Sequence, residues 1–163
     1  MSGRGVIPGL LGVLLLVGAG PGGCSSEREV AVRLLGVGPQ CGGAGAGPRA
    51  RRLASATEVA AALSPGLGEP QATPAVDWGA EAVVLVAMGQ RPTAGHGVEL
   101  ASRKAPVKDG AAGLRVTFSS PPAGALTAQV MTSPCLVVAL PRQGLRAVAV
   151  LDGDRVVATL GLE

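Results

Sequence analysis

A wholly apolar run, Ala82–Met88, most constrains how this chain can fold. Seven consecutive residues without a polar side chain suit a central strand that is buried on both faces. Hydrophobic residues make up 47% of the chain but aromatic residues only 1%, so Val, Leu and Ala must fill the core. Small β-branched side chains pack well on a pleated sheet. The sequence therefore predicts a fold that is mainly β.

Other extended segments accompany this run. Leu114–Ser119 alternates apolar and polar side chains, as a half-buried strand does. Residues 145–161 read as a C-terminal hairpin around Asp152-Gly153-Asp154, because Asp-Gly suits a tight turn. Further extended pieces are predicted at Glu29–Gly36, Ala128–Met131 and Cys135–Leu140, whereas Lys104 to Gly113 is predicted as a polar turn.

One short helix is predicted at Val59–Leu63. The preceding Ser55 and Glu58 have the spacing of a capping box, and Pro65 ends the segment. The lone Trp78 is expected to pack into the core. One helix among seven or eight strands predicts a small antiparallel β-sandwich or a partly open barrel.

The first residues have the order of a secretory signal. Arg4 precedes the apolar run Leu10–Val17, which is short for a membrane span, and small residues follow up to Cys24. A cysteine in this place resembles a bacterial lipoprotein signal, in which Cys24 is lipidated, although Pro21-Gly22-Gly23 departs from the usual pattern. A soluble exported protein cleaved a few residues earlier and an uncleaved anchor are the alternatives.

These features predict three parts in the chain. Residues 1–23 are a signal peptide, residues 24–48 a lipidated N-terminus with the first strand and a Gly-rich loop, and residues 49–163 a β domain. Position 25 is not Asp, and in this the chain resembles lipoproteins that are sent to the outer membrane. We therefore expect a cell-envelope protein, in the outer membrane, that faces the periplasm or the cell surface. Because one acyl chain binds a membrane weakly, several would be needed for a stable anchor.

Charge and cysteine content narrow the function classes. Without Arg4, 14 − 1 = 13 basic residues face 11 acidic ones, and this even balance with almost no aromatic residues argues against nucleic-acid binding. In an oxidising compartment Cys41 and Cys135 could pair, with two free buried thiols as the alternative. His96 is the sole imidazole, and no nucleophile-elbow or zinc-binding motif is present. We therefore expect that the chain is not an enzyme and that it binds no cofactor, metal or small-molecule substrate. We expect His96 to be an exposed loop residue.

Five motifs, in order and spacing, resemble the C-terminal domain of the PrcB family, named for a subunit of a bacterial surface protease complex. The resemblance covers residues 76–142. His96 and Cys135 stand where aromatic residues are common in that family, and Ala94 stands where a second Gly is usual. The matching pieces are Val76-Asp77-Trp78, the apolar run, Gly89–Gly95, Leu114–Phe118, and Thr132-Ser133-Pro134 leading into Leu136–Pro141.

The resemblance implies a small, exported, often lipid-anchored and non-catalytic domain that associates with or stabilises a protease. Its partner would be an envelope protease or another envelope protein, with membrane contact through the lipid anchor. A chagasin-like peptidase inhibitor that uses the Pro92–Gly95 loop is an alternative, and a structural envelope lipoprotein without a protease partner is a second one. The predicted interaction residues are Gln90, Arg91, Pro92, Thr93, Gly95, His96, Ser133 and Pro134.

Overall fold

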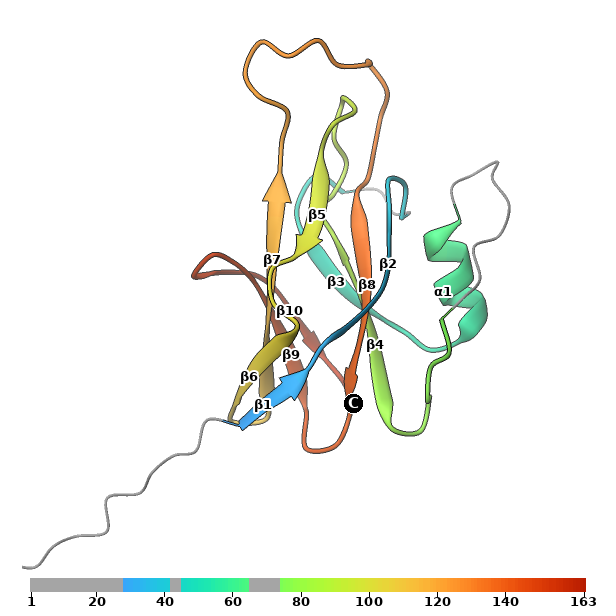
Figure 1. Cartoon of the computed structure of the whole chain (residues 1–163), viewed down its shortest axis with the longest axis vertical. Helices are drawn as coiled ribbons and strands as arrows, with labels where there is room; N and C mark the ends of the chain where they lie inside the picture. The colour runs from blue at the N-terminus through green and yellow to red at the C-terminus, as the bar shows by residue number, and fades with distance from the viewer. Residues whose placement is uncertain (1–27, 42–44, 65–73) are drawn as a thin grey trace, which may run out of the picture.

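The computed structural model describes residues 28–41, 45–64 and 74–163. The predicted signal peptide, Cys24 and Pro65, which was predicted to end the helix, lie outside the described residues. Within them, ten strands form two sheets that pack face to face, with one helix on the outside (Figure 1). The predicted β-sandwich with one short helix is confirmed. No helix in the described part is long and apolar enough to cross a membrane.

The larger sheet has six strands and is mixed. Its order is β1-β6-β7-β9-β10, and β5 pairs with the second half of β7. β7 and β9 run parallel, in contrast to the antiparallel pairs expected, because β8 carries the chain back through the other sheet between them. The strands are β1 (Arg28–Ala31), β5 (Gly97–Leu100), β6 (Lys104–Lys108), β7 (Ala111–Ser119), β9 (Ala147–Asp152) and β10 (Arg155–Gly161).

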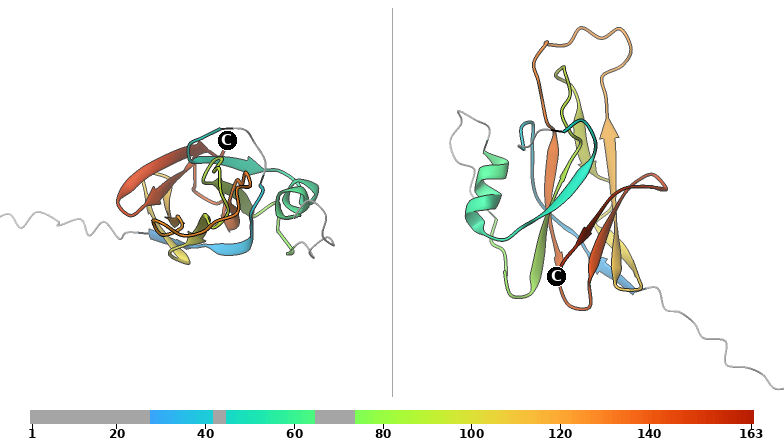
Figure 2. Two further views of the ribbon diagram at one scale, coloured as in Figure 1. Left: turned by 90° about the horizontal axis from the view of Figure 1, so that it is seen from above. Right: turned by 180° about the vertical axis from the view of Figure 1, so that it is seen from behind.

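The smaller sheet carries the predicted central strand. Its order is β2-β8-β4-β3, and the helix α1 (Ala56–Leu63) covers its outer face (Figure 2). The strands are β2 (Arg33–Gly38), β3 (Arg49–Leu53), β4 (Glu81–Ala87) and β8 (Cys135–Pro141).

The two central strands, β4 and β8, are apolar because both of their faces are covered. Val84 and Val138 point into the core between the sheets, whereas their neighbours Val83 and Val137 pack in a second core beneath α1. All four side chains are 0–1% exposed. Unbroken apolar sequence is what a strand needs when it has no solvent face, so the prediction for Ala82–Met88 is confirmed.

The helix begins as its sequence predicts. Ser55 is the N-cap, and its Oγ accepts a hydrogen bond from the Glu58 backbone N–H at 3.2 Å. The Glu58 carboxylate in turn accepts from the Ala54 N–H at 2.9 Å. Val59, on the buried face of α1, is 0% exposed. Trp78 only partly fills its expected role, because it packs half-buried at the margin of the same second core.

Three local predictions are wrong. The predicted first strand, Glu29–Gly36, is two strands in different sheets, β1 and β2, joined at Val32, whose N–H donates to the Arg103 carbonyl oxygen at 2.8 Å. The predicted polar turn Lys104–Gly113 contains β6 and the start of β7, which leaves only a short turn at Asp109-Gly110. Ala128–Met131 contains no strand and belongs to a long loop between β7 and β8.

The sandwich has two distinct ends. β1 starts at one end beside Val107 of β6, and β7 leads from there to the opposite end, where it terminates at Ser119. The long β7–β8 loop projects from that opposite end in both the front and rear views (Figures 1 and 2). The N-terminal side of the described chain and this loop therefore lie at opposite ends of the molecule.

Candidate functional site

Two loops form a continuous structure at one end of the sandwich, and we call residues 89–97 and 120–134 the tip loops. The backbones of Arg91 and Thr132 exchange two hydrogen bonds, each of 2.8 Å. The Thr132 hydroxyl also donates to the Thr93 carbonyl oxygen at 3.0 Å. The two segments that share the family resemblance thus lie side by side.

A third segment supports the tip loops from below. The Ser133 N–H donates to the Pro39 carbonyl oxygen at 2.9 Å, and the Cys41 N–H donates to the Ser133 carbonyl oxygen at 3.1 Å. The Gln40 side-chain amide donates to the Met131 carbonyl oxygen at 2.6 Å. The chain after β2 therefore pairs with the second tip loop just before β8 begins.

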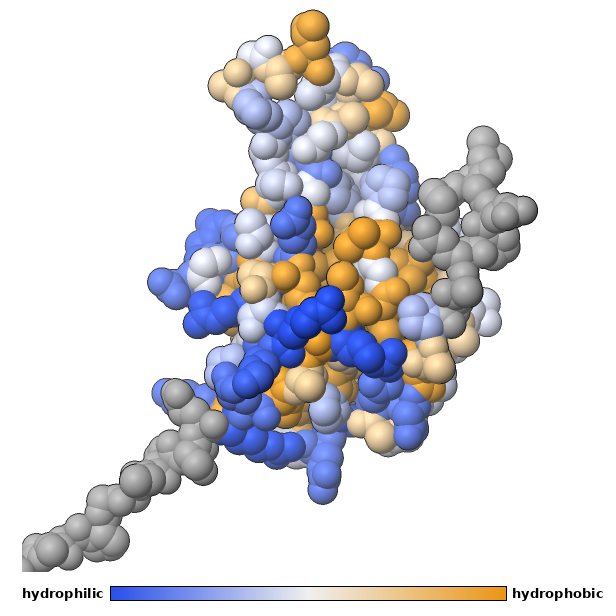
Figure 3. All heavy atoms as spheres, viewed as in Figure 1, coloured by the Kyte–Doolittle hydropathy of each residue, from blue (hydrophilic) through white to orange (hydrophobic). Residues whose placement is uncertain are grey.

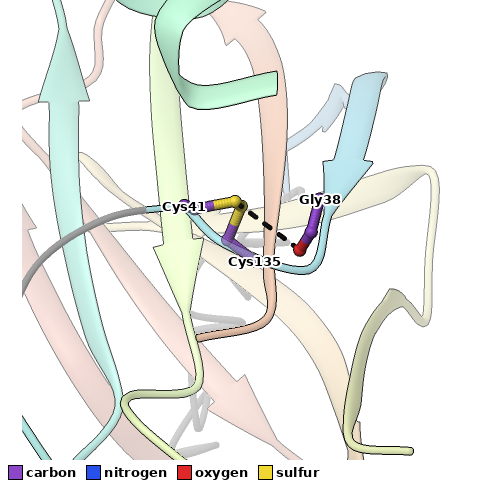
Figure 4. The surroundings of a disulfide bond; sticks show 3 residues. All are labelled: Gly38, Cys41 and Cys135. Carbon is purple, nitrogen blue, oxygen red and sulfur yellow. Dashed lines mark hydrogen bonds between the residues drawn. A yellow bond between two sulfur atoms is a disulfide. The ribbon is translucent and has the colours of Figure 1, made fainter. Parts of the chain in front are cut away.

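A disulfide between Cys41 and Cys135 fixes this supporting segment (Figure 4). The two Cα atoms are 5.6 Å apart, which is within the usual range for a disulfide. Both cysteines are nearly inaccessible, at 3% and 1% exposure. The dashed contact in Figure 4 joins Cys41 Sγ to the Gly38 carbonyl oxygen at 3.6 Å, and it is a packing contact because a disulfide sulfur has no proton to donate.

Arg91 has a structural role in the first tip loop. Its guanidinium donates to three backbone carbonyl oxygens, those of Ala46 at 3.0 Å, Gln90 at 3.2 Å and Met88 at 3.1 Å. A planar guanidinium can serve several acceptors in fixed directions. Most of the donor capacity of Arg91 is therefore used inside the molecule and not offered to a partner.

His96 is tied to both tip loops. Its Nε2 lies 3.2 Å from the Thr93 hydroxyl oxygen, and its Nδ1 lies 3.2 Å from the Ser120 hydroxyl oxygen. The side chain is half-buried, so the expectation of an exposed loop histidine is corrected. Its two partners are hydroxyl groups that hold the ring across the loops.

Two glycines allow the close approach of these segments. Gly89 has φ +89°, and a Cβ there would lie 2.6 Å from the Gly47 carbonyl oxygen. Gly95 also has φ +89°, and a Cβ there would lie 2.9 Å from Cγ of Pro121 in the second tip loop. Both positions combine a left-handed backbone with a close neighbour, which explains why glycine is needed.

The predicted interaction residues divide into a surface and a support. Gln90, Pro92 and Gly95 are exposed, and Arg91, Thr93 and His96 are half-buried. Ser133 and Pro134 are buried, so they lie beneath the surface that a partner could touch. The structure brings all eight residues together at one end of the sandwich, but in these different layers.

Sequence reasoning missed the largest part of this end, the loop 120–131. This loop contains Pro121-Pro122 and the fully exposed Leu126. The available signal was the absence of any Asp, Glu, Lys or Arg from Ser119 to Pro134. An uncharged stretch of this length outside a core strand is unusual for a surface loop.

A shallow pocket of about 310 Å³ opens just below the tip loops. It lies between the end of β2 and the start of β5, and its lining includes Val37, Pro39, His96, Val98 and Pro134. Among the described residues, no three His, Cys, Asp or Glu side chains are grouped so that they could hold a metal ion.

A family model described as PrcB C-terminal matches residues 82–141, the span from β4 to the end of β8 that includes both tip loops. No curated protein and no solved structure matches the chain.

Proposed function

Because residues 82–141 belong to the PrcB C-terminal family, we propose that this chain is a non-catalytic lipoprotein of the bacterial cell envelope. In this proposal it binds a surface or periplasmic protease, or another envelope protein, as an accessory or stabilising subunit. The tip loops provide the binding surface. The observation that carries the proposal is that the matched residues include the preformed tip loops, whose exposed side chains are uncharged.

The geometry of the tip loops supports binding more than catalysis. The His96 ring is engaged by the Thr93 and Ser120 hydroxyl groups and has no carboxylate partner among the described residues. Hydrogen bonds and a disulfide hold the loops in place, and a preformed surface loses less conformational entropy when it binds a partner.

The proposed address is the outer membrane, through lipidation of Cys24. We expect Cys24→Ala to abolish globomycin-sensitive processing and to release the chain from the membrane fraction. The matched control is Cys41→Ser combined with Cys135→Ser, which leaves Cys24 in place. Unchanged processing in Cys24→Ala would contradict the lipoprotein proposal.

The binding role is tested by chemical cross-linking of the full-length protein in intact cells, followed by purification and mass spectrometry. We expect a protease, or a protein that a protease acts with, to be recovered in a fixed ratio to the chain. The full-length protein carries an affinity tag for the purification. The control carries the same signal segment and tag but lacks residues 28–163. Recovery of no specific protein would favour a structural lipoprotein without a protease partner.

A peptidase inhibitor is a second candidate, supported by the exposed Pro92 turn beside a second projecting loop. Two adjacent loops at one end could enter a protease cleft together. Titration of papain-like peptidases with the purified chain tests this activity. If an inhibitory activity is measured and Pro92→Gly with Thr93→Gly leaves it unchanged, the Pro92–Gly95 loop is not the inhibitory element.

A further inference from the structure

The loop 120–131 presents an unusual set of side chains to solvent. Leu126 is 104% exposed, Val130 48% and Met131 54%. Of the five large hydrophobic side chains exposed in the described part of the chain, these three lie on this one loop. Figure 3 shows hydrophobic residues at the far end of this projection, away from the charged surface of the sandwich. Exposed apolar side chains gathered on one projecting loop suit a contact surface.

Internal hydrogen bonds hold the loop in its projecting form. The Ala125 N–H donates to the Pro122 carbonyl oxygen at 3.1 Å, and Gly124 has φ +81°, so residues 122–125 form a turn directly before Leu126. The Ala94 N–H donates to the Ala128 carbonyl oxygen at 3.0 Å and ties the loop to the first tip loop. Leu126 is thus presented to solvent by an organised backbone.

We infer that the loop 120–131 inserts Leu126 into an apolar, uncharged cleft on the partner protein. This inference rests on the proposed function and names the part of the surface that carries the binding. A leucine side chain at the end of a projecting loop fits a concave site, and a few side chains that fill well-packed, desolvated pockets carry most of the binding energy of an interface. The absence of charge from Ser119 to Pro134 matches a neutral cleft.

The position of the loop favours a protein over the membrane that would hold Cys24. Only three residues lie between Cys24 and Arg28, so this tether spans at most about 14 Å. The path along β7 from Ala112, near Arg28, to Ser119 already covers about 24 Å, and the loop begins beyond it. When the sandwich stands upright on a tether at Arg28, the loop therefore lies at the end farther from that membrane.

Composition favours the same partner. Membrane-surface elements combine apolar side chains with Lys and Arg, which are attracted to anionic headgroups. Residues 119–134 contain neither Lys nor Arg. A protein cleft needs no such cations, and the binding should then depend little on salt concentration.

The test places a photo-reactive amino acid at position 126 of the full-length protein in living cells. Position 156 is the matched control, because Val156 is also an exposed hydrophobic residue, at 55%, and lies on β10. We expect position 126, and not position 156, to cross-link to the protein recovered by chemical cross-linking. In binding measurements with that protein, Leu126→Asp should weaken affinity at least tenfold, with Val156→Asp within twofold of the unchanged chain.

Each outcome separates this inference from the proposed function. If the partner is recovered but Leu126→Asp binds it normally, the inference is wrong and the proposed function stands. If no partner is recovered at all, the proposed function falls as well. A Leu126-dependent dimer in sedimentation experiments, or Leu126-dependent binding of the Cys24→Ser chain to phosphatidylethanolamine–phosphatidylglycerol vesicles, would assign the loop to a second copy or to lipid and would overturn the inference. Unchanged thermal unfolding of Leu126→Asp, or the same loss of affinity in Leu126→Ala, shows that the substitution acts on binding and not on folding.

Discussion

The two ends of the sandwich are built with different chemistry. At one end, the base turns, which are residues 75–81, 108–111 and 142–146, are held by charged side chains. Arg33 makes two contacts of 2.8 and 2.9 Å with the Glu81 carboxylate, and Arg146 donates to the Asp109 carbonyl oxygen at 2.8 Å. At the other end, the tip loops are held by a disulfide, by backbone hydrogen bonds, by hydroxyl groups and by the inward-facing guanidinium of Arg91.

This difference explains how the tip can project without a charged surface. A loop held by surface ion pairs must carry those charges on its outside. The tip loops instead use a buried covalent link and hydrogen bonds to main-chain atoms, so their outer side chains are left for contacts. The comparison predicts that the stability of the tip depends on redox state and hydrogen-bond geometry, whereas the stability of the base depends on salt concentration.

The largest expected effect comes from removing the disulfide. Cys41→Ser together with Cys135→Ser should lower the free energy of unfolding by about 2–4 kcal/mol, because the bridge closes a loop of 94 residues in the unfolded chain. Urea unfolding followed by circular dichroism measures this loss. Wild type unfolded with a reductant should match the double variant. Equal stability of all three samples would show that the disulfide does not stabilise the tip.

Arg91 provides the next largest effect. Arg91→Lys keeps the charge but not the planar fork, so most of the three carbonyl contacts should be lost at a cost of about 1.5–3 kcal/mol. Chemical denaturation measures the cost, and backbone amide exchange at Gln90 and Thr132 locates it. Arg115→Lys, which changes an exposed arginine of β7, is the control. A stability loss no larger than that of the control would contradict the structural role of Arg91.

The sequence was sufficient for the parts of the fold that repeat a simple pattern. The apolar run of β4, the alternation in β7 and the cap of α1 are local signals, and each was read correctly. The division of Glu29–Gly36 between two sheets was not predictable, because it depends on the long-range hydrogen bond between Val32 and Arg103. The parallel β7–β9 pair likewise depends on the path of the chain through the other sheet.

The candidate site was predictable in its position but not in its layers. The family resemblance pointed to Gly89–Gly95 and Thr132–Pro134, which the structure places side by side. The inward direction of Arg91 and the burial of Ser133 depend on carbonyl groups from the distant segment around Ala46 and Pro39. No local sequence pattern encodes those contacts. The exposure of Leu126 likewise depends on the folded form of its loop and not on a local pattern.

The hydroxyl of Thr132 tests the junction between the tip loops. Thr132→Val keeps the side-chain shape but removes the donor to the Thr93 carbonyl oxygen, and Thr132 is only 9% exposed. We expect a loss of about 1 kcal/mol in the free energy of unfolding. Thr132→Ser, which retains the hydroxyl, should recover most of it. If Thr132→Val is as stable as wild type and Thr132→Ser is not, packing rather than the hydrogen bond joins the loops.

The smallest effect should come from the base, and it should depend on salt. Glu81→Gln removes the charge that faces Arg33, whose side chain is 44% exposed against 21% for Glu81. Partly exposed ion pairs contribute about 0.2–1 kcal/mol, so the variant should be less stable than wild type by that amount in dilute buffer. The difference should shrink in about 1 M NaCl, where the Debye length is only about 3 Å.

Glu99→Gln is the control, because Glu99 is an exposed acid with no ion pair among the described residues. If the Glu81 variant loses the same stability at both salt concentrations, the carboxylate acts through its hydrogen bond to the Asp77 N–H, and the contrast between a charged base and a neutral tip loses its electrostatic basis.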